Sequence, residues 1–266
     1  MRFVGAIKAL FSLFTVIPVN VTGEDVDELS RHFWLAPIIG LFYGLVAGGL
    51  FLILTQVFDG LVSAVLVIFV VHGLNRFLHF DGLIDQGDGL IATGTHEKKL
   101  AAMKDTRVGA GGVGFGIMFT FLTIVSLAFV EQVSVRVMVF FLPLAMEVLA
   151  KNALVTVAAL GQPREGLGSP FVKNTPKWHA APSALLSLAI LYVALILLYP
   201  WNPVYLLALV VLMVLTSSAV GAVTAAVGRK SFGCVNGDIM GATNELAKPA
   251  VLLMGMMGVV LFLLMF

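Results

Sequence analysis

Three aspartates and a histidine stand close together in one short stretch, and their spacing suits metal chemistry. Asp81, Asp85 and Asp88 fall at i, i+4 and i+7, so a helix would bring all three onto one stripe. Three anions on one face repel each other and lose hydration unless a cation binds them. All three offer oxygen donors, and no Cys or His recurs at zinc spacing, which favours a hard divalent ion. The stretch therefore predicts a Mg²⁺ cofactor and phosphate chemistry; a solvated acidic turn is the simpler alternative.

The composition places this acidic stretch beside a membrane. Hydrophobic residues make up 59% of the 266 residues and charged residues only 12%, with a mean hydropathy of +1.03. A soluble domain carries about twice that share of charge. We therefore expect an all-α fold, a polytopic transmembrane bundle in contact with the lipid bilayer. At this length, residues 1–266 form a single integral membrane domain.

Seven apolar runs are predicted to span the membrane, since about 20 apolar residues cross a bilayer. They are Trp34–Val57, Leu61–Leu78, Val113–Val130, Val137–Leu160, Ser183–Leu198, Val204–Val227 and Pro249–Phe266. The N-terminal run Phe3–Val19 is interrupted by Lys8 and ends at Pro18. An interfacial helix fits that run better than a full span.

Short connectors and long polar segments alternate between these runs, so the long segments emerge on one side. The long segments are Phe80–Gly112, Gly161–Pro182 and Gly228–Lys248. They hold most of the Lys and Arg residues of the chain, whereas the short connectors hold only Arg136. Lys and Arg mark cytoplasmic loops. We therefore expect a multi-pass protein of the cell membrane with its active site on the cytoplasmic face.

Two classes of function are disfavoured by composition. The single cysteine, Cys234, leaves no internal disulfide and no zinc or redox motif. A net charge of +1 without a basic run argues against nucleic acid as a partner. A homo-oligomer stays open.

Basic residues of the long segments are candidate substrate ligands. Lys104, Arg107 and Arg164 could bind phosphate, Arg in a bidentate way and Lys as a point charge. Membrane orientation alone would also explain basic residues in these segments.

A general base is expected just outside the metal site. A metal-bound carboxylate is a poor base because the cation lowers its pKa. Asp105, two residues from Arg107, is therefore the predicted catalytic base, and Asp88 is the alternative. An ordinary surface ion pair with Arg107 is the alternative explanation for Asp105. His79 could orient a carboxylate or a substrate phosphate, although such a histidine is as often structural.

The last long segment offers a second set of oxygen donors. Asp238 and Glu245 lie seven residues apart and Asn244 is adjacent, so they could converge as a second half of the site that binds nucleotide or metal. A capped helix start is the alternative reading. Within the spans, Glu147 and Lys151 at i and i+4 could neutralise each other.

Four motifs occur in order along the chain. They are His-x-Asp-Gly-x-x-Asp-x-x-Asp-Gly at His79–Gly89, Met-x-Asp-x-Arg-x-Gly at Met103–Gly109, Glu-Gly-Leu-Gly at Glu165–Gly168 and Gly-Asp-x-x-Gly-Ala-x-x-Glu at Gly237–Glu245. With them the chain resembles the cobalamin 5′-phosphate synthases, also called adenosylcobinamide-GDP ribazoletransferases. Gln86–Gly87 departs from the family pattern, between two of the expected ligands.

The resemblance implies a late step of coenzyme B12 synthesis. Adenosylcobinamide-GDP would react with α-ribazole 5′-phosphate, or with α-ribazole, to give adenosylcobalamin 5′-phosphate or adenosylcobalamin, with release of GMP. Metal ions held by carboxylates, with Arg and Lys nearby, would supply the electrostatic stabilisation.

Two other classes remain as alternatives. A CDP-alcohol phosphotransferase acting on phospholipid precursors would carry Asp-Gly-x-x-Ala-Arg, but Asp85 and Gln86 stand where that motif has Ala and Arg. A cation-coupled transporter would place its acids mid-span in broken helices.

Overall fold

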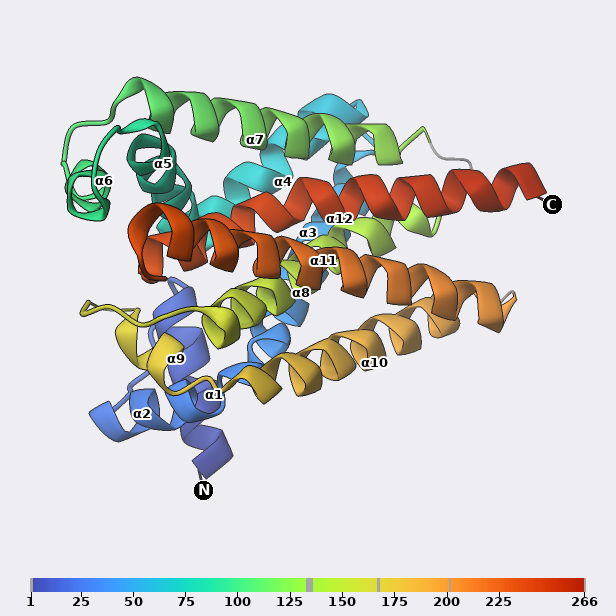
Figure 1. Cartoon of the computed structure of the whole chain (residues 1–266). Coiled ribbons are helices and arrows are strands. Elements are labelled where there is room, and N and C mark those ends of the chain that lie inside the picture. Colours follow the sequence, from blue (N-terminus) through green and yellow to red (C-terminus); the bar gives the residue numbers. More distant parts are fainter. Residues whose placement is uncertain (1, 133–135, 167, 201, 266) are drawn as a thin grey trace.

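The computed structural model describes residues 2–132, 136–166, 168–200 and 202–265, and it confirms an all-α bundle (Figure 1). Four features of the sequence fall partly outside these residues. They are the short connectors Glu131–Arg136 (residues 133–135) and Pro200–Pro203 (Trp201), the Glu165–Gly168 motif (Leu167) and the end of the last apolar run (Phe266). Within the described ranges there is no strand, and Pro163 and Val235 form an isolated bridge.

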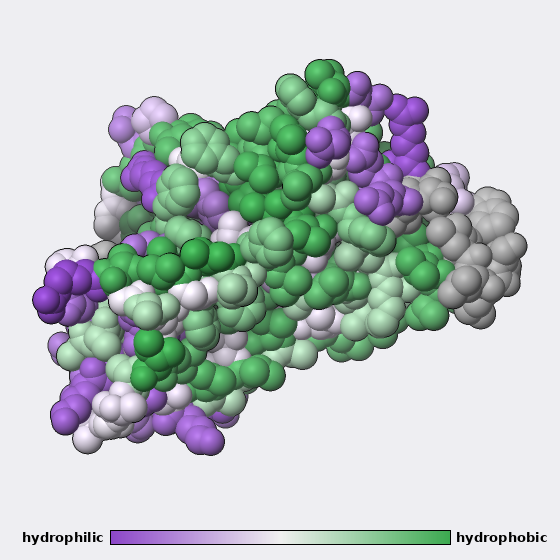
Figure 2. Space-filling model, turned by 90° about the horizontal axis from the view of Figure 1, so that it is seen from above, coloured by the Kyte–Doolittle hydropathy of each residue, from purple (hydrophilic) through white to green (hydrophobic). Residues whose placement is uncertain are grey.

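Among the described residues, six helical segments are long and apolar enough to cross a membrane. They contain α3 (Pro37–Leu54), α7 (Ala110–Val130), α8 (Met138–Leu160), α10 (Ala180–Leu198), α11 (Pro203–Phe232) and α12 (Gly237–Met265). Figure 2 shows one face of this bundle, mainly hydrophobic along its middle, with hydrophilic residues gathered toward the ends.

The remaining predicted span, Leu61–Leu78, is broken by a bend. It consists of α4 (Gly60–Leu74) and α5 (Leu78–Ile91), which meet at an angle of 95°. α4 runs with the bundle, whereas α5 lies across its end, where the labels of α5 and α6 stand in Figure 1. The acidic stretch is therefore carried by the second helix of this bent pair, at the end of the bundle.

Short elements cover the same end of the bundle (Figure 1). They are α1 (Arg2–Phe14), α2 (Gly23–Arg31), α6 (His96–Met103), α9 (Ser169–Lys173) and the 3₁₀ turns η1 (Phe33–Leu35) and η2 (Lys177–His179). At 13 residues, α1 is about 20 Å long and too short to cross a bilayer upright. This length agrees with the prediction of a helix that does not span.

α8 forms the centre of the bundle and determines where α12 lies. Almost every side chain of α8 is buried, and the helix packs against α3, α11 and α12. The last predicted span, Pro249–Phe266, starts too late, because α12 already begins at Gly237 and its candidate span is Gly237–Leu261. The charges of Glu245 and Lys248, which suggested a polar loop, pair with each other at 3.0 Å (Oε1 to Nζ) inside the bundle.

Glycines let α5 pack directly against two neighbours. A Cβ atom on Gly82 would lie 2.5 Å from the carbonyl oxygen of Asp238 in α12, and one on Gly87 would lie 2.6 Å from that of Gly111 in α7. Any larger residue would push the helices apart. The glycine-rich stretch Gly109–Gly114 is helical from Ala110 onward, where α5 packs against it.

We expect Gly82→Ala to lower the free energy of unfolding by about 1–3 kcal/mol, because overpacking separates α5 from α12. Gly114→Ala is the matched control, since a Cβ there meets nothing within 4 Å, and alanine favours a helix over glycine. Unfolding in detergent with increasing SDS would measure both variants. Equal stability of the two would contradict the close approach of α5 and α12.

Candidate active site

The three aspartates of α5 lie on one stripe, as the spacing predicts. Asp81 is exposed and Asp85 and Asp88 are partly exposed, whereas Leu83 and Gln86 on the other side of the helix are buried. The stripe is acidic and reachable from solvent at the end of the bundle.

Asp238 approaches this stripe from a segment more than 150 residues later in the sequence. Its backbone lies against Gly82. Asn236 fixes its side chain, since Asn236 Nδ2 donates to Asp238 Oδ2 at 2.9 Å and Asn236 Oδ1 accepts from the backbone N–H of Ile239 at 3.0 Å. The sequence interpretation missed Asn236, although an Asn just before a helix that begins with Gly-Asp is a recognisable N-terminal cap.

Burial and the charges of neighbouring carboxylates both act on Asp85. Burial raises the pKa of the Asp85 carboxyl to about 7, and the negative charges of Asp238, Asp81 and Asp88 add to the effect. A carboxylate placed among negative charges in this way belongs to the kind of donor set that a hard divalent cation neutralises. Within the described residues, however, no group of three or more His, Cys, Asp or Glu side chains is gathered closely enough to hold a metal ion. The donor types fit Mg²⁺, and the metal site stays a prediction.

Backbone N–H groups at the start of α7 bind the carboxylate of Asp88. Its Oδ2 accepts the backbone N–H of Gly109 and its Oδ1 that of Gly112, both at 2.8 Å. A carboxylate at a helix N-terminus satisfies free N–H groups and interacts favourably with the helix dipole. Asp88 therefore fastens α7 to α5, and each of its oxygens already accepts one hydrogen bond.

Asp105 pairs with Arg107 at the surface. Arg107 Nη2 donates to Asp105 Oδ2 at 3.0 Å and Arg107 Nε to Oδ1 at 3.2 Å. These hydrogen bonds lower the pKa of the Asp105 carboxyl to about 2. A carboxylate with so low a pKa is a weak base, so proton abstraction by Asp105 would require Arg107 to turn away.

The other two predicted phosphate ligands gather near Cys234. Burial raises the pKa of the Cys234 thiol, while the charge and hydrogen bond of Arg164 and the charge of Lys104 oppose the rise. The segment that carries Arg164 is tied to this place, because the backbone N–H of Val235 donates to the carbonyl of Gln162 at 2.7 Å. The structure thus brings Lys104 and Arg164 to the segment that leads into Asp238.

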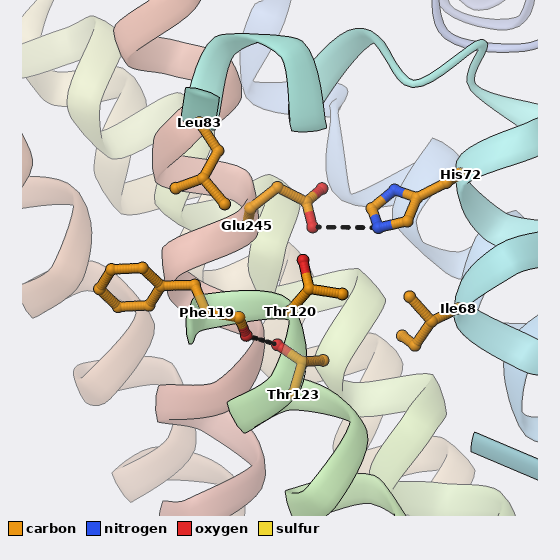
Figure 3. A pocket seen from close by; sticks show the side chains of 7 residues that line it. All are labelled: Ile68, His72, Leu83, Phe119, Thr120, Thr123 and Glu245. Atoms are coloured by element: carbon orange, nitrogen blue, oxygen red, sulfur yellow. Dashed lines mark hydrogen bonds and ion pairs between the residues drawn. The ribbon is translucent and has the colours of Figure 1, made fainter. Parts of the chain in front are cut away.

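Asn244 and Glu245 point away from the acidic end. Glu245 lies seven residues beyond Asp238 on the same helix, about 10 Å along its axis. Its Oε2 faces Nε2 of His72 at 3.9 Å across a small pocket of α4, α5, α7 and α12. Figure 3 shows these two side chains turned toward each other. The pocket is also lined by Ile68, Leu83, Phe119, Thr120 and Thr123.

A buried network of ion pairs surrounds Glu245. Lys248 Nζ lies 3.0 Å from Glu245 Oε1 and 3.4 Å from Glu147 Oε1. Lys151 Nζ lies 4.0 Å from Glu147 Oε2, as the i, i+4 spacing predicts, and donates to Asn244 Oδ1 at 2.5 Å. The two Glu and two Lys charges cancel formally, which lowers the cost of placing them inside the bundle.

His79 belongs to this interior and not to the exposed stripe. Its side chain is 2% exposed and stacks on Phe14 of α1 with ring centroids 5.8 Å apart. Neither ring nitrogen has a hydrogen-bond partner among the described residues. The structure therefore separates the predicted residues into two groups, with Asp81, Asp85, Asp88, Asp238, Lys104 and Arg164 at the polar end and His79, Asn244 and Glu245 inside.

Fold and site together define a polytopic helical membrane protein with an acidic site, flanked by cations, at one end of its bundle. A sequence model of the family described as cobalamin-5-phosphate synthase matches residues 6–257. The chain belongs to this family. The match includes every motif that carried the resemblance.

Curated relatives agree along nearly the whole length. The chain is 35% identical over 273 aligned positions to the adenosylcobinamide-GDP ribazoletransferase of Methanocella arvoryzae, with 98% of each chain covered. It is 31% identical to that of Methanosarcina barkeri, covering 93% of this chain and 90% of the relative. It is also 31% identical to that of Prosthecochloris aestuarii, covering 89% and 92%. No solved structure matches the chain significantly.

The raised pKa of Asp85 predicts a pH-dependent stability in the absence of metal. Its pKa in the folded protein, about 7, exceeds 3.8, the ordinary value for an aspartate, so the folded state binds the proton more tightly than the unfolded state. With EDTA present, this group should stabilise the protein increasingly as the pH falls from about 8 through 7, and fully only near pH 4.

Asp85→Asn should remove that contribution and be the more stable protein above about pH 7, because a neutral amide relieves the repulsion. Asp27→Asn in α2 alters an exposed carboxylate elsewhere and should keep the wild-type profile. Unfolding temperatures in detergent across this pH range would measure the effect. Parallel profiles for wild type and Asp85→Asn would show that the pKa of Asp85 is not raised in the folded protein.

Proposed function

We propose that this protein is a Mg²⁺-dependent adenosylcobinamide-GDP ribazoletransferase. It would transfer the adenosylcobinamide phosphate moiety from adenosylcobinamide-GDP to α-ribazole 5′-phosphate or α-ribazole, and release GMP. One observation carries the proposal: Asp238, from the last family motif, lies against α5, which carries the first. Residues that the family shares in sequence thus meet at one place in the fold.

The carboxylates would hold the metal. Asp81, Asp85 and Asp238 offer oxygen donors, and Asp88 adds negative charge while it holds α7. Bound Mg²⁺ would supply neutralisation of the charge on the pyrophosphate and on the leaving phosphate. Binding would also displace the proton that burial and the neighbouring charges favour on Asp85, because metal and proton compete for the same oxygens.

The cations at the same end would bind the substrate phosphates. Lys104 and Arg164 lie beside Cys234, and Arg107 is largely exposed, with 88% of its side chain accessible. A bidentate contact from Arg107 to a phosphate would take it from Asp105, whose pKa would then rise toward its ordinary value. Asp105 would accept the proton of the attacking ribose hydroxyl only once substrate is in place.

From the positions of the Lys and Arg residues we propose that the protein lies in the plasma membrane with this site facing the cytoplasm. The polar end carries Lys104, Arg107, Arg164, Arg229 and Lys230, which is the distribution expected of cytoplasmic loops. Soluble substrates would reach the site from that side. A homo-oligomer would be compatible with this arrangement.

GMP release tests the proposal directly. Purified protein with Mg²⁺ and adenosylcobinamide-GDP should release GMP only when α-ribazole or its 5′-phosphate is added. Release without the acceptor would indicate a hydrolase, and transfer to a lipid alcohol would support a CDP-alcohol phosphotransferase. Metal-independent turnover would contradict the Mg²⁺ site.

Asp105→Asn should lower kcat by about 10²–10⁴-fold, the usual contribution of a general base. It should leave the affinity for Mg²⁺ nearly unchanged, because Asp105 touches Arg107 rather than the acidic stripe. Asp27→Asn is the control at an exposed carboxylate. Loss of Mg²⁺ affinity with full residual kcat would make Asp105 a ligand instead of a base.

A further inference from the structure

The joint between α4 and α5 is conformationally strained. Arg76 and Phe77 have φ angles of 55° and 58°, in the left-handed region that costs free energy for residues with a Cβ atom. Two successive residues in this region produce the 95° bend. Such a conformation persists only where surrounding contacts hold it.

The chain just after α1 provides two of those contacts. The backbone N–H of Val16 donates to the carbonyl of Leu74, the last residue of α4, at 2.8 Å. Arg76 Nη2 donates to the carbonyl of Thr15 at 3.1 Å. Both hydrogen bonds link the joint to a segment about 60 residues earlier in the sequence.

Phe14 extends this contact to the first turn of α5. Its ring stacks on His79 with an interplanar angle of 14°. Its carbonyl accepts a hydrogen bond from the hydroxyl of Tyr43 in α3, and Lys151 Nζ lies 5.4 Å from the centroid of the Tyr43 ring. The end of α1 is thus fixed to the bundle on one side and to α5 on the other.

We propose that Phe14–Val16 act as a clamp that sets the angle of α5, with Arg76 and Tyr43 as positioning residues for the acidic site. Its effect on catalysis rests on the proposed function. The close packing at Gly82 fixes where α5 touches α12, and the bend sets the direction in which α5 runs from that contact, and so how Asp81 and Asp85 face Asp238. Displacements of about 1 Å at an active site can reduce turnover about 100-fold.

Matched pairs of variants separate this role from general packing. Tyr43→Phe removes the hydroxyl bonded to Phe14, whereas Tyr205→Phe removes a hydroxyl bonded to the carbonyl of Gly258 in α12. Arg76→Gln removes the bond to Thr15, whereas Arg136→Gln removes a bond to Gln56. Arg76→Lys is the conservative variant, since lysine can still donate to Thr15.

Two measurements are needed, and one is independent of activity. Hydrogen–deuterium exchange should be about two- to tenfold faster at the amides of residues 78–85 in Tyr43→Phe and Arg76→Gln, the range expected from one lost hydrogen bond. It should be unchanged there in both controls. In the GMP-release assay with saturating substrates, kcat should fall at least tenfold in the clamp variants, recover in part in Arg76→Lys, and stay at the wild-type level in the controls.

Unchanged exchange in residues 78–85 of the clamp variants would overturn the clamp. Faster exchange with wild-type kcat would overturn the positioning role of Arg76 and Tyr43. If the wild-type protein released no GMP, the proposed function would fail, and the exchange data alone would still decide whether the clamp exists.

Discussion

The position of α5 across the end of the bundle is the constraint on which the site depends. One side of this helix carries three carboxylates that must remain hydrated or bound to a cation, and glycines on its other sides let it pack tightly on α7 and α12. Both requirements are met only where the chain leaves the apolar part of the bundle. The 95° bend at the end of α4 places α5 there, and Asp88 then holds the first turn of α7 against it.

Buried ion pairs position α12, which carries Asp238, the part of the site that lies opposite α5. Glu245 and Lys248 in α12 are joined to Glu147 in α8, a helix with hardly any exposed side chain. Removing one partner of such a set leaves an unpaired charge in an apolar interior, which is strongly destabilising. The pairing therefore holds α12 in register with α8, and the first turn of α12, with Asp238, meets α5 as a consequence.

The sequence predicts the local features and misses those that depend on distant partners. The i, i+4, i+7 spacing of Asp81, Asp85 and Asp88 and the apolar runs depend only on neighbouring residues. The aspartates do lie on one helix, and six of the seven runs fall in helices that could span a membrane, whereas Leu61–Leu78 is broken by a bend. The start of α12 was predicted wrongly, because Glu245 and Lys248 look like loop residues until Glu147, about 100 residues away, neutralises them. The N–H partners of Asp88 and the left-handed Arg76 have no local sequence signal either.

The central claim is that α5 and the first turn of α12 form one cation site. A structure of the protein with Mn²⁺ in place of Mg²⁺ tests this claim most directly, since the anomalous scattering of manganese locates the ion without any assumption about the reaction. The account predicts a peak between α5 and α12, within coordination distance of Asp85 and Asp238 carboxylate oxygens, about 2.0–2.2 Å. A peak on Asp105, a peak elsewhere in the bundle, or no bound manganese at concentrations that support turnover would contradict it.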